Sequence, residues 1–325
     1  MGDGEASKQP ILIVGAGGML GTALVRVAPE LGHTARAYTE QELDITDRAA
    51  LGEAVARFAG EISKGGAAGG GETAGGGGEV AGAVEATGAV INSAAYTDVE
   101  RAEDDAERAY LINELAASWV AEAARENGLA MVHVSTDFVF DGTKGAPYSE
   151  TDATHPLSVY GASKLAGERS VLAAHPTALV IRTAWTYGPG GTNFPLKILQ
   201  RAKAAIEDAD PAKRVLRVVT DEVGCPTYSV DLATGLLGLL SAGATGLFHL
   251  AGAGFCSRYE LALEALRLAG FDVPGELTVE PVPSAMFPMK AVRPQTAVLD
   301  CGKAAQVGVR LPAWQDGLSR FLAEL

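Results

Sequence analysis

Short apolar runs alternate with amphipathic stretches along the first half of the chain. Apolar runs of strand length that are bounded by glycine or polar residues are typical of strands buried on both faces. The stretches between them repeat their apolar positions at helical spacing. We therefore expect strands at 11–14, 33–38, 89–93, 129–135 and 178–183, and helices at 22–31, from a cap at 44–47 to about 58, at 104–127 and at 160–174.

This regular alternation ends near Thr183. An aromatic and turn-rich loop follows at 185–194, just past the carboxyl end of a predicted strand, where ligands bind in open α/β sheets. Further strands are predicted at 215–220 and 246–251, around a helix at 229–240. Two more helices, at 257–269 and 314–325, flank a proline-rich stretch at 273–294.

Strand–helix alternation predicts an α/β fold with a doubly wound, Rossmann-like parallel sheet and a smaller C-terminal substrate-binding domain. We assign residues 1–185, completed by 223–251, to the dinucleotide-binding domain, and residues 186–222 and 252–325 to the substrate-binding domain. The stretch 65–88 is dominated by Gly and Ala, so we expect a flexible insertion on the surface. Residues 1–9 are polar and predict a loose tail.

Composition narrows the class of protein. A chain of 325 residues with 47% hydrophobic and 20% charged residues is globular. Its net charge of −14 argues against a nucleic-acid partner, which needs a basic footprint. No signal peptide and no apolar run of membrane-spanning length are apparent, so we expect a cytoplasmic protein without a membrane partner. Cys225, Cys256 and Cys301 have no metal-like spacing, so we expect reduced thiols and no metal.

A glycine-rich turn follows the first predicted strand. Gly15, Gly18 and Gly21 stand between that strand and the first helix. Glycine is needed where a turn is tight and the backbone must approach a pyrophosphate, and the helix N-terminus then offers unpaired N–H groups to the anion. The order of strand, turn and helix predicts a dinucleotide site, and a tight turn without a ligand is the simpler alternative.

Tyr160 and Lys164 are four residues apart, so they share one face of the predicted helix. An ammonium placed there can favour the phenolate form of the tyrosine, whose ordinary pKa of about 10 is high for proton transfer at neutral pH. The hydroxyl of Thr136, just past the fourth strand, could hold a carbonyl oxygen against that phenol. Such a pair by itself also fits a helix face with an exposed lysine.

Several motifs occur in one order from Ile11 to the C-terminus, outside the Gly-rich insertion. Together they resemble the extended short-chain dehydrogenases/reductases that act on nucleotide sugars, and within them the dTDP-4-dehydrorhamnose reductases. The motifs are the GxxGxxG at Gly15, INSAAYT at 91–97, STDFVFDG at 135–142, YGASKLAGE at 160–168, RTAW at 182–185, GCPT at 224–227, Arg293-Pro294 and LPAW at 311–314.

The resemblance implies a reduction of a sugar C4 keto group by NADH or NADPH, giving dTDP-L-rhamnose for the cell envelope. Tyr160 would be the general acid, Lys164 would hold the nicotinamide ribose and lower the pKa of Tyr160, and Thr136 would bind the reacting oxygen. The family's other cofactor contacts fall on Gly15, Gly18, Met19, Leu20, Asp44, Ile45, Ala94, Ala95 and Tyr96, and its sugar contacts on Val99, Phe138 and Trp185.

The chain departs from the family pattern in three places. Phe138 stands where the family commonly has Tyr, and the stretch 293–297 reads RPQTA instead of RPxNS. Near the end of the second strand, Glu40 lies in a stretch that often contains Arg. A carboxylate there would repel a 2′-phosphate and could accept from a ribose hydroxyl, which favours NADH over NADPH.

Two other functions stay open. One is a reductase or epimerase of a different nucleotide-linked 4-keto-6-deoxy sugar; a dehydratase is disfavoured because Asp137 is followed by Phe138 instead of a second acid. The other is a non-catalytic regulatory subunit resembling that of methionine adenosyltransferase. We expect a nucleotide-sugar substrate, and a homodimer as the assembly.

Overall fold

A six-stranded sheet lies at the centre of the computed structural model, which describes residues 9–67 and 87–325. The strand order is β10-β5-β4-β3-β1-β2, and every neighbouring pair is parallel, which confirms the predicted fold class. These strands are β1 (Ile11–Val14), β2 (Ala35–Tyr38), β3 (Ala89–Asn92), β4 (Ala130–Thr136), β5 (Leu179–Thr183) and β10 (Gly246–His249).

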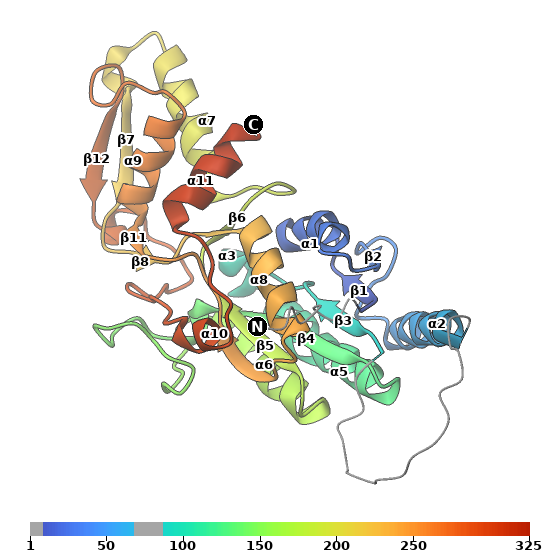
Figure 1. The fold of residues 1–325 in the computed structure, drawn as a ribbon. Coiled ribbons are helices and arrows are strands. Elements are labelled where there is room, and N and C mark those ends of the chain that lie inside the picture. Colours follow the sequence, from blue (N-terminus) through green and yellow to red (C-terminus); the bar gives the residue numbers. More distant parts are fainter. Residues whose placement is uncertain (1–8, 68–86) are drawn as a thin grey trace.

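Helices cover both faces of this sheet (Figure 1). Side chains alternate along β1, so that Ile11 and Ile13 pack with α1 (Met19–Glu30) and α8 (Ser229–Ser241). Leu12 and Val14 face the other way, into the core that α2 (Arg48–Ala67), α5 (Ala117–Glu126) and α6 (Val159–Ala174) share. Burial of β1 on both faces explains why its sequence is uniformly apolar.

The second predicted helix is longer in the structure than the sequence pattern indicated. Helix α2 is capped by Asp47, whose carboxylate accepts from the N–H groups of Ala49 and Ala50, and it continues to Ala67 instead of ending near 58. The prediction of a flexible insertion at 65–88 is therefore wrong at its first residues. Most of that insertion, and nearly all of the tail predicted at 1–9, lie outside the described residues.

The helix predicted at 104–127 is interrupted. It consists of α4 (Ala106–Tyr110), a π-helical segment at Leu111–Ala116 and α5, and a short helix α3 (Val99–Ala102) precedes it. In the π-helical segment, the Asn113 side chain turns inward. It accepts from the Tyr96 N–H at 2.8 Å and donates to the hydroxyl of Ser163 at 2.9 Å. These contacts join the segment to the chain after β3 and to α6.

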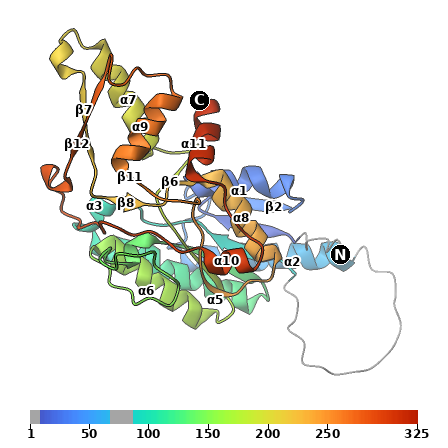
Figure 2. The ribbon, with the colours of Figure 1, turned by 60° about the vertical axis from the view of Figure 1, so that its left-hand side comes forward.

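The later part of the chain builds a second group of elements, set apart from the sheet in both views (Figures 1 and 2). The strand expected at 215–220 is β7 (Val215–Val219), and it pairs in parallel with β12 (Thr278–Val282) instead of joining the main sheet. Their core also includes α7 (Phe194–Glu207) and α9 (Arg258–Leu268), beside α11 (Trp314–Ala323). The division into two domains stays a prediction, in which α8 and β10 belong with the first.

The proline-rich stretch and the aromatic loop contain elements that the pattern did not indicate. Strand β12 lies inside 273–294, and α7 starts one residue after Asn193, whose side chain accepts from the N–H of Leu196 at 3.1 Å. Asparagine followed by Pro195 near the helix start is a recognisable N-terminal signal. The smaller elements are β6 (Thr186–Tyr187), β8 (Val223–Gly224), β9 (Thr227–Tyr228), β11 (Cys256–Ser257) and α10 (Gly302–Gln306).

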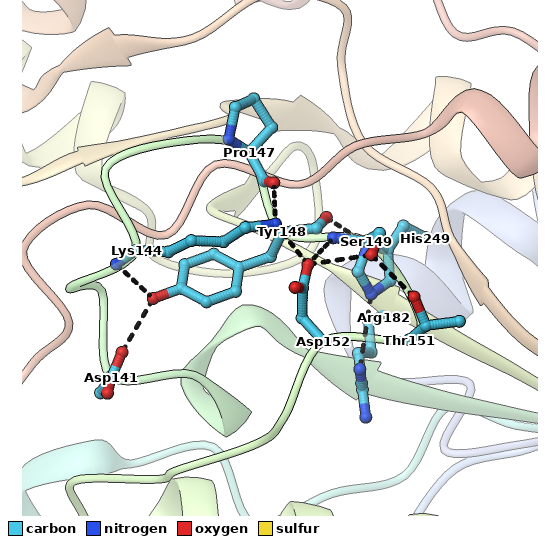
Figure 3. Close-up of polar contacts among 9 residues, drawn as sticks. All are labelled: Asp141, Lys144, Pro147, Tyr148, Ser149, Thr151, Asp152, Arg182 and His249. Carbon is cyan, nitrogen blue, oxygen red and sulfur yellow. Dashed lines mark hydrogen bonds and ion pairs between the residues drawn. The ribbon is translucent and has the colours of Figure 1, made fainter.

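The loop that leaves β4 is fastened to the sheet by polar contacts (Figure 3). The Tyr148 hydroxyl donates to Asp141 at 2.8 Å, and the Tyr148 carbonyl oxygen lies 3.0 Å from Nδ1 of His249 on β10. The Tyr148 ring also stacks on Phe140, with ring centroids 4.1 Å apart. These contacts fix the backbone that follows the carboxyl end of β4.

Candidate active site

A cavity of about 800 Å³ opens over the carboxyl ends of the central strands. The strand order reverses between β1 and β3, and such a switch point is where open α/β sheets bind ligands. The volume suits a ligand larger than a single sugar, since drug-sized molecules occupy cavities of about 300–1,000 Å³. The cavity extends from the turn after β1 to Arg258 and Arg293 of the later elements.

The turn after β1 is built for close approach. Gly15 has φ of +82°, and a Cβ added there would lie 2.4 Å from the backbone nitrogen of Ala94. A Cβ on Gly21 would lie 2.3 Å from the Gly15 carbonyl oxygen. The glycines therefore let α1 begin directly against the ends of β1 and β3, with its free N–H groups at the cavity. This cradle fits the pyrophosphate of a dinucleotide.

Thr136, Tyr160 and Lys164 all line this cavity. Thr136 is the last residue of β4, while Tyr160 and Lys164 lie in the first turns of α6. Ser158 begins that helix, because its hydroxyl accepts from the N–H of Gly161 at 3.2 Å. A Cβ on Gly161 would lie 2.3 Å from the Phe138 carbonyl oxygen, so glycine lets α6 approach the end of β4.

Lys164 is buried, and its ammonium group donates to the carbonyl oxygen of Val134 at 2.6 Å. Burial lowers the pKa of Lys164 to about 8, opposed by the negative charge of Glu168. In contrast, the pKa of Tyr160 is raised to about 12, because removal from water disfavours the phenolate. The nearby Thr136 side chain lowers the pKa of Tyr160 but does not offset the effect of burial. The role of Lys164 in lowering that pKa stays a prediction.

A buried ion pair between Glu168 and Arg182 connects the helix that carries Tyr160 to the strand beside the one that carries Thr136. The Glu168 carboxylate on α6 accepts from Arg182 on β5 at 2.8 and 2.7 Å, and from the Ser135 hydroxyl on β4 at 2.6 Å. The Arg182 and Glu168 side chains are only 4% and 5% exposed. The network joins α6, β4 and β5, the three elements that carry or adjoin the Tyr160 and Thr136 side chains.

The two aromatic residues predicted for a sugar pocket both line the cavity. Phe138 packs edge-on against Tyr160, with ring centroids 5.4 Å apart and planes at 77°. Trp185 has a backbone φ of +44°, which residues other than glycine rarely adopt. Its indole lies where a Cβ on Gly224 would come within 2.5 Å, so glycine leaves room for the ring.

Two arginines were absent from the predicted site. Arg258, at the start of α9, has its guanidinium carbon 3.5 Å from the ring centroid of Trp185. Its Nε lies 3.4 Å from a carboxylate oxygen of Glu222. Arg293 lies 3.3 Å from Glu100 on α3. Nothing in the sequence near Arg258 indicates that it lines a cavity. Arg293 belongs to the Arg293-Pro294 motif, so the second arginine had a signal in the sequence.

The structure brings nearly all predicted site residues to one cavity. Tyr96 is the exception, because it is not among the lining residues and its hydroxyl donates to Asp105 at 3.3 Å. Glu40 also lines the cavity, 4.0 Å from Arg108. The predicted residues that line it are Gly15, Gly18, Met19, Leu20, Asp44, Ile45, Ala94, Ala95, Val99, Thr136, Phe138, Tyr160, Lys164 and Trp185.

Within 9–67 and 87–325, no group of three or more His, Cys, Asp or Glu side chains is arranged to hold a metal ion. Over the same ranges, no helix has the length and apolar character needed to cross a membrane.

Comparison with known proteins gives consistent matches. The family model of the RmlD substrate binding domain matches residues 9–325. A dTDP-4-dehydrorhamnose reductase of Mycolicibacterium smegmatis is 37% identical, over 98% of this chain and 86% of the relative. A dTDP-4-keto-6-deoxy-D-glucose reductase of Streptomyces niveus is 35% identical, over 89% and 87%.

A solved structure shows the same arrangement of elements. The crystal structure of dTDP-4-dehydrorhamnose reductase from Bacillus anthracis, in complex with NADP, aligns with a TM-score of 0.83. The two chains are 29% identical, and the alignment covers 98% of this chain and 100% of the other.

Proposed function

Because the chain belongs to the family of the RmlD substrate binding domain, we propose that it reduces the C4 keto group of dTDP-4-dehydro-L-rhamnose to give dTDP-L-rhamnose. The family resemblance drawn from the sequence motifs is confirmed by the matching family model and relatives. The observation that supports the reaction most directly is the convergence of Thr136, Tyr160 and Lys164 on the cavity that begins at the Gly15 turn.

Reduction of a ketone needs a hydride at carbon and a proton at oxygen. A reduced nicotinamide dinucleotide supplies the hydride when bound. Tyr160 is proposed to give the proton, since a pKa raised to about 12 keeps its phenol protonated at neutral pH. The alkoxide that forms as hydride arrives is more basic than a phenolate, so the proton transfer from Tyr160 runs downhill. Thr136 supplies a second hydroxyl to the same oxygen.

Lys164 is proposed to hold the nicotinamide ribose. Its ammonium is already fixed on the Val134 carbonyl oxygen at 2.6 Å, which leaves further N–H groups free to donate to ribose hydroxyls. The Gly15 turn and the N-terminus of α1 are proposed to bind the pyrophosphate, with Asp44 and Ile45 toward the adenine.

The sugar nucleotide is proposed to bind on the Trp185 side, against Val99 and Phe138. A diphosphate needs local positive charge in a protein of net charge −14, and Arg258 and Arg293 provide it on this side of the cavity. Phe138 lacks the hydroxyl of the tyrosine common in the family, so the sugar is recognised there through its apolar edge.

For the cofactor, we propose a preference for NADH over NADPH. Glu40 lines the cavity near the end of β2 and would face a 2′-phosphate. Glu42 is not part of the lining, but it adds a second carboxylate to the same turn, where it accepts from the N–H and hydroxyl of Thr39 at 2.8 Å each. The related structure from Bacillus anthracis contains NADP and therefore does not support this preference. The argument for NADH rests on the two carboxylates of this chain.

The test is an assay of the purified protein with dTDP-4-dehydro-L-rhamnose and each reduced cofactor, following the loss of nicotinamide absorbance and identifying the sugar. We expect turnover to dTDP-L-rhamnose, with the higher kcat/KM for NADH. A tenfold preference for NADPH would contradict the cofactor proposal. Cytoplasmic location and a homodimer also stay predictions, the second to be checked by analytical ultracentrifugation.

A second candidate is reduction of a different 4-keto-6-deoxy sugar nucleotide. The relative from Streptomyces niveus carries a name of that kind, and Phe138 alters the pocket toward the sugar. Turnover of dTDP-4-keto-6-deoxy-D-glucose but not of the L-rhamnose precursor would favour it. Product analysis in the same assay would also detect epimerisation, and absence of all turnover would favour a non-catalytic regulatory role.

A further inference from the structure

Asp137 is a buried carboxyl group at the reaction cavity for which the proposed mechanism has no use. It directly follows Thr136, lines the cavity and is only 2% exposed. Its Oδ1 lies 2.9 Å from the hydroxyl oxygen of Thr136. Its Oδ2 is buried and has no hydrogen-bond partner within residues 9–67 and 87–325. Buried carboxyl oxygens are ordinarily paired, so the arrangement of this group needs an explanation.

The Thr136 hydroxyl has one hydrogen to donate and two lone pairs that accept. One lone pair is taken by the N–H of Phe138, at 3.3 Å. An ionised Asp137 can only accept, so it draws the single hydroxyl hydrogen of Thr136 toward itself. A protonated Asp137 can donate to the second lone pair instead, and the hydrogen of Thr136 is then free to point elsewhere.

We propose that Asp137 is a positioning residue, whose protonated form turns the Thr136 hydroxyl hydrogen toward the reacting carbonyl oxygen and whose ionised form withdraws it. This inference rests on the proposed function, because the oxygen concerned is that of the sugar keto group. No proton leaves Asp137 during the reaction: Tyr160 still supplies the proton, and Asp137 decides whether Thr136 donates a hydrogen bond beside it.

The charges around Asp137 allow it to be protonated near neutral pH. Burial raises its pKa to about 7, against the hydrogen bond from Thr136 and the positive charge of Arg258 on α9. Arg258 shares its charge with Glu222, 3.4 Å away, and so compensates Asp137 only in part. The other groups that face it are the phenol of Tyr160 on α6 and the thiol of Cys225, both of which burial keeps neutral at pH 7.

The consequence is a fall in kcat as pH rises through the pKa of Asp137. A group with a pKa of about 7 is roughly nine-tenths protonated at pH 6 and about one-tenth at pH 8, so the ionisation of Asp137 by itself should lower wild-type kcat about tenfold. Lys164, with a pKa of about 8, adds a second decline above that point. The two groups can be separated by substitution.

The experiment compares pH profiles of kcat for wild type, Asp137→Asn and Asp137→Val. Asparagine keeps the shape and has N–H groups that can donate to Thr136 at every pH. We expect Asp137→Asn to lose the limb near pH 7, so that only the decline of Lys164 remains and kcat falls about twofold between pH 6 and pH 8. Asp137→Val cannot donate and should have a lower kcat than Asp137→Asn throughout.

The matched control is Asp141→Asn, four residues along and bonded to Tyr148 outside the cavity lining. It should keep the wild-type profile. If Asp137→Asn keeps the limb near pH 7, or is no more active than Asp137→Val at pH 6, the inference is wrong while the proposed function stands. If the wild-type protein turns over no keto sugar at any pH, the proposed function is wrong and this inference falls with it. Cofactor binding by each variant, followed by fluorescence, shows whether it is folded.

Discussion

The guanidinium group of Arg258 lies over the indole ring of Trp185, with its central carbon 3.5 Å from the ring centroid. The two residues come from different parts of the molecule, since Trp185 follows β5 of the main sheet and Arg258 begins α9. The wall of the proposed sugar pocket is therefore assembled by both. A Trp residue whose backbone has a positive φ is strained, and the contacts of its ring with Arg258 and Gly224 hold it in this conformation.

Substituting Arg258 should weaken sugar-nucleotide binding. Arg258→Lys keeps a charge but loses the planar contact with Trp185, and a cation–π contact is worth about 0.5–2 kcal/mol. We expect KM for the sugar nucleotide to rise about three- to thirtyfold, with little change in cofactor Kd. Steady-state kinetics and fluorescence titration would show this, and Arg217→Lys on the exposed face of β7 is the control. An equal loss of both affinities would contradict this assignment.

Removing the Tyr160 hydroxyl should abolish most catalysis. General-acid help is typically worth about 10²–10⁴-fold, so Tyr160→Phe should lower kcat within that range. The cofactor Kd should change little, because the phenol hydroxyl is not proposed to carry the pyrophosphate or adenine contacts. Single-turnover kinetics with both substrates would measure the chemical step, and an unchanged rate would mean that the proton comes from another group.

Breaking the buried ion pair should destabilise the protein. Glu168→Gln leaves Arg182 buried without a counter-charge, and loss of one partner of such a pair costs about 3–5 kcal/mol. Asp104→Asn is the control, since the Asp104 and Lys290 side chains are 63% and 64% exposed and such pairs contribute at most about 1 kcal/mol. Urea unfolding followed by circular dichroism would compare them. Equal midpoints would show that the buried pair adds no stability.

Substituting Glu40 should shift cofactor choice. Glu40→Gln removes a carboxylate from the cavity and frees Arg108, 4.0 Å away, to meet a 2′-phosphate. Because both side chains are largely exposed, the gain in kcat/KM for NADPH relative to NADH should be modest, about three- to tenfold. The ratio of kcat/KM for NADPH to that for NADH should be measured for wild type and variant at the same salt concentration. An unchanged ratio would show that Glu40 has no part in cofactor choice.

The protonation of Asp137 should also affect stability. Its folded pKa, about 7, lies above the ordinary value near 4, so between these values the folded state binds the proton more tightly. The free energy of unfolding should therefore fall as pH rises from 4 to 7, by at most about 4 kcal/mol, and the contribution of Asp137 is smallest above pH 7. Asp137→Asn should lose this part of the fall. Melting temperatures of both proteins across that range would test it, and parallel curves would contradict it.

Much of the fold could be predicted from local patterns. Strand β1 is an apolar run because burial on both faces disfavours polar residues, and the glycine turn follows from the backbone geometry at Gly15. By contrast, β12 was hidden in a proline-rich stretch, and α7, which begins at the last residue of the aromatic loop, was not predicted. Edge strands and helices of a small lobe are selected by their neighbours, so their patterns are weaker.

By itself, the sequence determined the alternation of strands and helices along the chain, the Gly15 turn and the shared helix face of Tyr160 and Lys164. Each of these depends on residues close together in the chain. Only the tertiary structure decided that Arg258 covers Trp185, that Lys164 is bonded to Val134 and that Asp137 is shut away from water. Burial and charge at a site depend on which distant segments pack over it. Those contacts set the pKa values of Tyr160 and Asp137, and no local pattern encodes them.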